Sequence, residues 1–202
     1  MPAIANSIII AVSIGLSLPP SQEFLNIDPA HLSSQPTIDP CTLADSPKLN
    51  ASMQLSRWLE CQINGFYPFP ANKNWPAGHA RSFSRSLKFT FNETHYDFNG
   101  SLQLYKSFNK TLGEAFHPFK HGHINTLGVP NANGDKGGFV YMIGWAGGFQ
   151  TRARRNMYFT NAAFAVVGVE QGERKIVEFR ESGNIPNTAV LPEPVEWGCE
   201  FK

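Results

Sequence analysis

Apolar residues recur every three or four positions in two parts of the chain, and this spacing predicts two amphipathic helices. The first covers residues 48–64, with Pro47 in the first helical position, where proline is favoured. The second covers residues 101–117 and ends before Pro118. Between residues 66 and 78, three prolines interrupt the pattern, so this segment is predicted to be a loop.

Elsewhere the apolar period changes to two, which is typical of β-strands. Apolar and polar residues alternate over residues 87–91 and resume in a shifted phase at Tyr96, which predicts a turn near Glu93. Longer strand-like runs follow, separated by turn-forming sequences, at residues 119–129, 138–151, 157–170 and 175–182. This order predicts an α+β fold in which a curved antiparallel sheet wraps over helices on one side and leaves a cone-shaped pocket.

The N-terminal part of the chain differs in composition from the rest. Residues 8–18 are mostly apolar, too short a stretch to span a bilayer but of the length of a signal-peptide core. The alternative is an ordered N-terminal strand or helix. We predict a signal peptide over residues 1–18, a proline-rich extended arm over 19–46, the folded domain over 47–184 and a C-terminal tail over 185–202. The expected location is therefore secreted or the lumen of the secretory pathway, with no membrane span.

Two further features fit a secretory route. Asn-x-Ser/Thr sequons predict glycosylation at Asn50, Asn92, Asn99 and Asn109. Three cysteines allow one disulfide and leave one thiol, and none lies in a pattern with zinc-ligand spacing. We expect Cys41 to pair with Cys199, because Cys61 lies on the first predicted helix, where it would be packed as a small apolar residue.

Composition narrows the class of function. Seventeen Lys and Arg against 16 Asp and Glu give a net charge of +1, so the chain has no domain-scale basic field to attract nucleic acid, and no nucleic-acid partner is predicted. Only 16% of residues are charged, which is low for a soluble domain, and glycans are one way of keeping such a surface hydrated.

Three stretches resemble the SnoaL-like branch of the nuclear transport factor 2-like superfamily: HYDFNGSLQLYKSF, FVYMIGWAGGFQT and GERKIVEFRESGN, the last being similar to the family's closing strand. The resemblance covers roughly residues 47–184. It implies a cone-shaped fold, often a homodimer, whose pocket hosts chemistry without metal or cofactor: cyclisation, dehydration, isomerisation or Diels-Alder-type pericyclic reactions. Other members only bind ligands, because a fold does not fix a function.

A pair of histidines is the first candidate for chemistry. His121 and His123 lie two residues apart in a predicted strand and so share a face with Phe119 and Asn125. Histidine titrates near neutrality, so the pair suits a general acid/base or hydrogen-bonding role in a cavity. An equally good interpretation is a half-exposed strand whose histidines face solvent. A metal site is not predicted, because the sequence places no third ligand beside the pair.

An aromatic strand face is the second candidate. Phe139, Tyr141, Ile143, Trp145 and Phe149 share one parity, with glycines nearby that permit curvature. This face would either cradle a planar or terpenoid substrate or form a plain aromatic core. The predicted substrate-binding residues are Trp58, Phe119, Asn125, Tyr141 and Trp145.

The closing strand supplies the third candidate. Alternation places Val177, Phe179 and Glu181 on one face. If the two apolar residues face the core, Glu181 points inward and loses hydration, which poises a carboxyl for acid/base work. The alternative is that Glu181 marks the exit of the strand into solvent. The predicted catalytic set is His121, His123 and Glu181.

These observations together favour an enzyme of small-molecule biosynthesis. We expect a cofactor-independent lyase or isomerase that shapes an apolar polyketide or terpenoid intermediate in its pocket. The alternative is a secreted protein that binds a small molecule or a partner without turnover.

Overall fold

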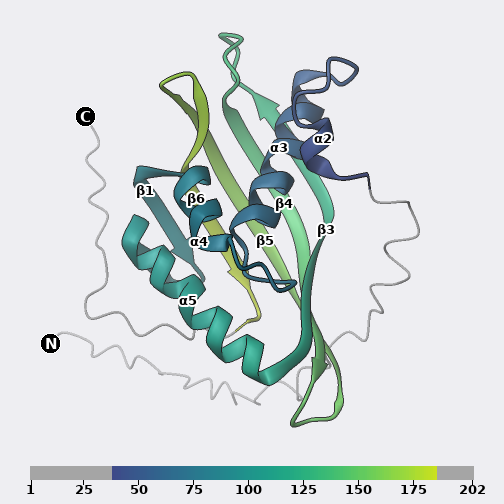
Figure 1. The fold of residues 1–202 in the computed structure, drawn as a ribbon. Helices are drawn as coiled ribbons and strands as arrows, with labels where there is room; N and C mark the ends of the chain where they lie inside the picture. The colour runs from purple at the N-terminus through teal and green to yellow at the C-terminus, as the bar shows by residue number, and fades with distance from the viewer. Residues whose placement is uncertain (1–37, 186–202) are drawn as a thin grey trace, which may run out of the picture.

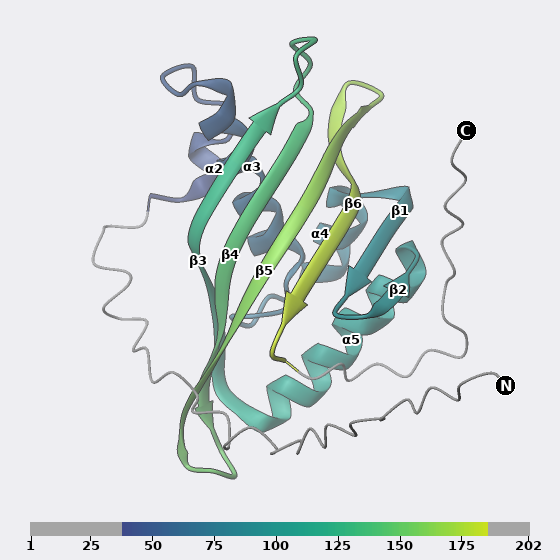
Figure 2. The same ribbon diagram turned by 180° about the vertical axis from the view of Figure 1, so that it is seen from behind.

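The structure, a computed structural model, describes residues 38–185, so the predicted signal peptide, most of the arm and the tail lie outside the described residues. Its elements are α2 (Pro40–Leu43), α3 (Ala51–Phe66), α4 (Trp75–Ser82), β1 (Phe83–Phe91), β2 (Thr94–Tyr96), α5 (Phe98–Ala115), β3 (Phe116–Pro130), β4 (Gly138–Gln150), β5 (Arg155–Glu170) and β6 (Glu173–Gly183). The helices lie on one face of a curved, open sheet, and the view from behind shows its other face (Figures 1 and 2). The predicted α+β fold class is confirmed.

The sheet has the strand order β2-β1-β6-β5-β4-β3. Strands β3 to β6 form an antiparallel meander, and β1 pairs with β6 in parallel. The four long strands and the turn between β1 and β2 are therefore where the alternation predicts them. No helix among residues 38–185 is long and apolar enough to cross a membrane.

Two helix predictions need correction. Helix α3 begins at Ala51, not at Pro47, because the side chain of Asn50 accepts a hydrogen bond from the Met53 backbone N–H at 2.9 Å and caps the helix there. Helix α4 lies partly in the segment predicted to be a loop. Its Pro76 occupies the first turn, where a missing N–H costs nothing, so this proline starts a helix and does not break one.

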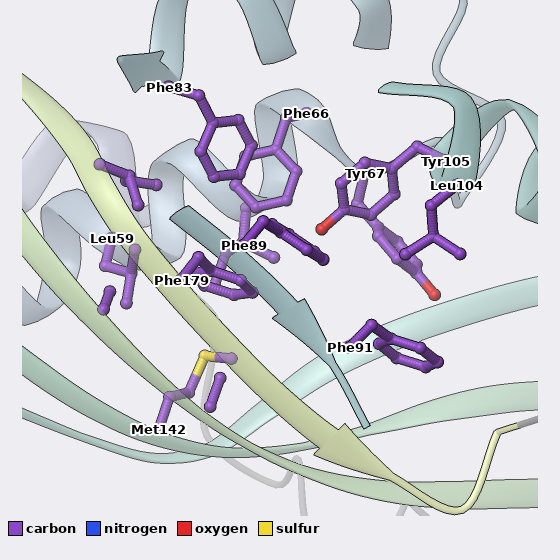
Figure 3. Packing of buried hydrophobic residues seen from close by; sticks show 14 of the residues in the cluster. Leu59, Phe66, Tyr67, Phe83, Phe89, Phe91, Leu104, Tyr105, Met142 and Phe179 are labelled. Atoms are coloured by element: carbon purple, nitrogen blue, oxygen red, sulfur yellow. The ribbon is translucent and has the colours of Figure 1, made fainter. Parts of the chain in front are cut away.

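A cluster of aromatic rings joins the helices to the sheet. The Phe66 ring of α3 lies 4.7 Å from that of Phe83 and 5.4 Å from that of Tyr105, measured between centroids. Phe179 of β6 stacks on Phe89 of β1 at 5.5 Å. Figure 3 shows these rings between the helices and the strands. All five are at most 2% exposed, so they form the centre of the core.

The faces of β4 are reversed relative to the prediction. Val140 and Met142 face the helices, whereas Phe139, Tyr141 and Ile143 are 43%, 54% and 51% exposed on the other side of the sheet. Both faces of this strand are apolar, so the inner one cannot be recognised by polarity alone. Tyr141 therefore lies on the face away from the helices, where it contacts Phe164.

The disulfide differs from the predicted one. Cys41 pairs with Cys61, not with Cys199, which lies outside the described residues. The side of α3 that carries Cys61 faces α2 and is only half-buried, so this cysteine is accessible for pairing. The described end of the predicted arm is therefore a helix attached to the domain, and its Ala44 is buried in the core.

The sequon asparagines occupy different environments. Asn50, Asn99 and Asn109 are exposed. Asn92 has a positive φ of 53°, its side-chain oxygen accepts from the Gly183 backbone N–H at 2.9 Å, and its amide nitrogen donates to the Ile185 carbonyl at 3.3 Å. Its amide is thus used to join the β1–β2 turn to the end of β6, whereas glycosylation at the other three sites stays compatible with the fold.

A buried histidine lies between α4 and α5. His79 is fully buried, its Nε2 lies 2.9 Å from Ser101 Oγ, and its ring packs against Phe83 and Phe98. Burial, assisted by the nearby Arg85 charge, lowers the pKa of His79 to about 4. The neutral ring is therefore part of the core.

Peptide mapping without reduction should yield a Cys41–Cys61 crosslink. Reducing this bond, which joins residues 20 apart, should lower the free energy of unfolding by about 3 kcal/mol in urea titrations. The Cys199→Ser variant is the control and should keep both the crosslink and the stability. A crosslinked peptide that contains Cys199 would show the assignment to be wrong.

The pKa of His79 predicts an acid-sensitive fold. Because the folded-state pKa of about 4 lies below the ordinary 6.5, protonation favours the unfolded chain. Stability is then complete above pH 6.5 and falls by about 3 kcal/mol for this group as the pH drops to 4. Urea titrations of His79→Gln should show a shallower pH dependence, and exposed His117→Gln should match the parent. If His79→Gln does not fold, ring NMR of the parent decides: a protonated His79 at pH 6 would contradict the account.

Candidate active site

A pocket lies on the inner face of the sheet, enclosed by α3 and α5, and holds about 380 Å³ with its open mouth included. Its apolar wall comes from both layers and includes Ile63, Phe66, Met142, Ala146 and Phe179. Its polar groups are Tyr67, Tyr105, His121, His123, Asn161 and Glu181. The three residues predicted to be catalytic therefore line one pocket.

Strand register explains why these side chains meet. His123 of β3 pairs with Gly144 of β4, and Gly144 pairs with Asn161 of β5, so all three lie in one row across the inner face. The neighbouring row contains Met142, Ala163 and Glu181. Asn161 and Glu181 are thus on adjacent strands, one row apart.

Among residues 38–185, Glu181 is the only acidic residue that lines the pocket. Its carboxyl oxygen Oε1 lies 2.5 Å from the side-chain amide of Asn161. Burial raises the pKa of Glu181, and the contact with Asn161 opposes this in part. Glu181 therefore points into the pocket, as the strand alternation predicts.

Two tyrosines line the same pocket as Glu181. Tyr67 follows α3 and Tyr105 lies on α5, and their ring centroids are 6.0 Å apart (Figure 3). Burial first, and the charge of Glu181 second, raise the pKa of both phenols, so both stay protonated at neutral pH. Neither hydroxyl has a hydrogen-bond partner among residues 38–185, which leaves two donors for a bound molecule.

A β-bulge corrects the predicted alternation of β6. Ile176 pairs with Val167 and Glu178 with the adjacent Val166, so Val177 is passed over in the ladder. Ile176 is consequently fully buried and Val177 only half-buried. Phe179 and Glu181 lie beyond the bulge and keep the predicted inward direction.

His121 has partners at both ring nitrogens. Its Nδ1 lies 2.6 Å from the Phe69 carbonyl oxygen and its Nε2 lies 2.9 Å from the side-chain amide of Asn64. Burial first, then the neighbouring His123, lower the pKa of His121 to about 4, against the opposing effect of the Phe69 carbonyl. The ring is therefore neutral near pH 7 and joins β3 to the end of α3 and the loop that follows.

His123 has a similar arrangement. Its Nδ1 lies 3.2 Å from Met142 Sδ, and its Nε2 lies 3.3 Å from the same Asn64 amide. Burial lowers the pKa of His123, with Glu60 opposing this effect and Arg57 adding to it.

The Phe69 carbonyl fixes the tautomer of this pair. A carbonyl only accepts, so Nδ1 of His121 carries the proton, and in the neutral ring Nε2 must accept. The Asn64 amide satisfies both Nε2 atoms when its NH₂ group faces them, one hydrogen to each ring. Both histidines then act in positioning Asn64 and the loop, and Glu181 is left as the ionisable group with a free oxygen facing the pocket.

The remaining predicted binding residues lie elsewhere. Trp58 is buried on α3, and the Arg174 guanidinium lies over its indole, with Arg174 Cζ 5.8 Å from the Trp58 ring centroid. Phe119 packs between Phe69 and Phe116. Asn125 is exposed, because a register shift between His123 and Asn125 turns the following residues to the outer face. None of these side chains lines the pocket, and neither does Tyr141.

Trp145 is the one predicted binding residue that contributes to the lining formed by the described residues. It is the register partner of Gly122, on the opposite parity from His121 and His123. A Cβ on Gly122 would lie 2.6 Å from the indole Nε1, so the absent side chain leaves room for this ring. The indole also packs against Tyr158 at 5.8 Å.

Sequence reasoning missed Tyr67, Tyr105 and Asn161. Tyr67 lies in a proline-rich loop and Tyr105 in an amphipathic helix, and in neither place does the local sequence distinguish a pocket residue from a core residue. Asn161 gives a usable signal, since an amide that directly precedes the apolar run from Ala162 to Val167 in a strand needs a partner when it is buried.

No group of three or more His, Cys, Asp or Glu side chains within residues 38–185 is arranged to hold a metal ion. The pocket has the carboxyl, amide and phenol groups of acid–base chemistry.

The sequence matches no family model and no curated protein. Solved structures with a similar fold include a nuclear transport factor 2-like superfamily protein of Salmonella enterica serovar Typhimurium LT2, at 13% identity, with 73% of this chain and 96% of that one covered and a TM-score of 0.48. Another is a provisionally assigned SnoaL-like polyketide cyclase of Jannaschia sp. CCS1 (14% identity, 69% and 90% covered, TM-score 0.44). A third is the hexachlorocyclohexane dehydrochlorinase LinA-type3 of Novosphingobium barchaimii LL02 (15% identity, 63% and 81% covered, TM-score 0.43). Each of these is a likeness of chain arrangement with a TM-score below 0.5, so nothing about the activity of this chain is concluded from it.

The bonds of His121 predict its state in solution. Nitrogen-15 NMR of the imidazoles should show His121 with the proton on Nδ1, neutral at pH 7 and titrating only near pH 4. His117, which is exposed and does not line the pocket, is the internal control. A His121 ring that is protonated at pH 6, or whose proton sits on Nε2, would return this residue to the candidates for acid/base work.

Proposed function

We propose that this protein is a cofactor-independent enzyme that converts a neutral, largely apolar small molecule, of the polyketide or terpenoid kind, by proton transfer at Glu181. The observation that carries the proposal is the position of this carboxyl group. It lies in a pocket whose wall is mainly aromatic and aliphatic, beside an amide and two phenols without partners. A carboxyl so placed has its pKa moved toward neutrality, which suits a catalytic proton donor or acceptor.

The shape and charge of the pocket support the class of substrate. No Lys or Arg of the described residues lines it, so a carboxylate or phosphate would meet only Glu181 and neutral groups among them. Aromatic side chains offer broad contact area to rings and polyenes. A neutral molecule with one or two oxygens fits both the apolar wall and the few polar groups.

The same groups support a reaction class. Tyr67 and Tyr105 can donate hydrogen bonds to a carbonyl oxygen on which negative charge develops. Glu181 can then exchange a proton with the oxygen or with the carbon next to it. Ring closure, loss of water and double-bond isomerisation all use this set, and a pericyclic reaction would use the donors and the shape of the pocket.

The proposed function is tested by replacing Glu181 with Gln, and the same replacement of Glu178 on the same strand is the control. Metabolites of the source organism with and without the gene identify the compound that accumulates, and purified protein is then given that compound. Glu181→Gln should lower turnover on the order of 10²-fold or more while still binding it, because shape is kept and the exchangeable acid is lost. Glu178→Gln, which loses only an ion pair with half-exposed Arg180, should keep full turnover.

The outcomes separate enzyme from binding protein. Full turnover by Glu181→Gln would remove proton transfer at this residue from the mechanism. Binding of the accumulated compound without any product would favour the alternative, a secreted protein that only binds a small molecule.

A further inference from the structure

The contact between Asn161 and Glu181 is unusually short for an amide donor. The two side-chain atoms lie 2.5 Å apart. Hydrogen bonds from N–H to oxygen cluster near 2.9–3.0 Å, whereas O–H to oxygen bonds extend down to about 2.5 Å. The separation is compatible with a carboxylic O–H that donates to the amide oxygen of Asn161, and since Arg180 Nε lies equally close to Glu178, the length alone does not identify the donor.

The other end of the Asn161 amide gives an independent indication. With its nitrogen toward Glu181, its oxygen Oδ1 is buried without a hydrogen-bond partner. Buried acceptors are rarely left unpaired, because the lost hydration is not replaced. A Cβ atom built on Gly144 would lie 2.7 Å from this Asn161 oxygen and 3.0 Å from the Gly122 carbonyl oxygen, so both oxygens lie close to the α-carbon of Gly144. Turning the amide by 180° places its NH₂ group on the side of that carbonyl, which accepts.

Among residues 38–185, the lining around Glu181 includes no Lys or Arg that would stabilise a carboxylate. Its neighbours across the strands are Ala163 on β5 and Phe91 on β1, both apolar. The titratable groups that face the pocket from the other elements are Tyr67, Tyr105, His121 and His123. Burial keeps all four uncharged near pH 7.

We infer that Glu181 is a neutral carboxylic acid in the resting protein at pH 7 and that Asn161 accepts its proton while donating its own NH₂ group to the Gly122 carbonyl. Asn161 is thus a positioning residue that holds the acid proton in place until a substrate oxygen displaces it. Gly144 is part of the arrangement, because any side chain there would overlap the Asn161 amide.

This inference rests on the proposed function and narrows it to reactions that begin with proton donation. In a dehydration, the Glu181 O–H bond breaks as its proton passes to a substrate hydroxyl, and the C–O bond breaks to release water. The neighbouring carbon then loses a proton to the Glu181 carboxylate, which restores the acid. In a ring closure by carbonyl addition, the Glu181 proton passes to the substrate carbonyl oxygen as the new C–C bond forms at the carbonyl carbon. The C–H bond of the attacking carbon breaks, and its proton passes to the Glu181 carboxylate, which restores the acid. No oxidant or further reactant is needed.

The experiment is NMR of the full chain labelled with ¹³C and ¹⁵N, without any substrate. The Glu181 side-chain carboxyl, assigned through its own backbone, should show the shift of a protonated acid at pH 7. Nuclear Overhauser contacts should connect the Asn161 NH₂ protons to the Gly144 Hα protons. The signal should vanish in Glu181→Gln and stay unchanged in Glu178→Gln, and assignment in the parent protein keeps the test valid if the first variant does not fold.

A carboxylate shift for Glu181 at pH 7, or Asn161 NH₂ protons directed at Glu181, would overturn the inference. The proposed function would survive that result with Glu181 as a base. Conversely, full turnover by Glu181→Gln would refute the proposed function whatever the protonation state, so the two failures are distinguishable.

Discussion

The rings of Phe66, Tyr105 and Phe179 meet at the centre of the inner sheet face, one from each of α3, α5 and β6. Their size holds the two helices away from the sheet. Farther along the same face, β4 and β5 present small residues, among them Gly144, Ala146 and Ala163, which cannot fill the remaining space. The pocket is therefore the space left where large rings on one side meet small residues on the other.

This arrangement also decides which polar groups are available for chemistry. His121 and His123 lie where β3 passes the end of α3, so their nitrogens are taken up by Asn64, Phe69 and Met142. Within the described part of the chain, the side-chain hydrogen bond of Glu181 is the one with the Asn161 amide. Burial lowers the pKa of a histidine, so its ring stays neutral and has no acidic proton to donate. Burial raises the pKa of a carboxyl group, which favours the protonated form that can donate a proton.

Much of the fold could be predicted because alternation and helical spacing report directly on local structure. The errors arose where a local pattern has two solutions. Both faces of β4 are apolar, so the sequence does not show that Tyr141 points outward. Bulges passing over Val177, and between His123 and Asn125, change the parity of a strand in a way that only the pairing partner determines.

The candidate site was partly predictable for the same reason. Glu181 follows Phe179 at strand spacing, which is a local pattern, and its inward direction was predicted. Tyr67, Tyr105 and Asn161 join it from a loop, a helix and another strand, and no spacing in the sequence links them. Likewise the pairing of Cys41 with Cys61 depends on α2 lying against α3, a tertiary contact.

The central claim is that small neutral molecules bind beside Glu181, in the space between the aromatic rings and the sheet. Its most direct test is a crystal structure of the protein soaked with a neutral aromatic ketone, compared with the unsoaked crystal. The account predicts density for the ketone in contact with Phe179, with its oxygen within hydrogen-bond distance of Tyr67, Tyr105 or Glu181. A pocket that stays empty while the ketone binds the exposed face around Tyr141 would contradict it.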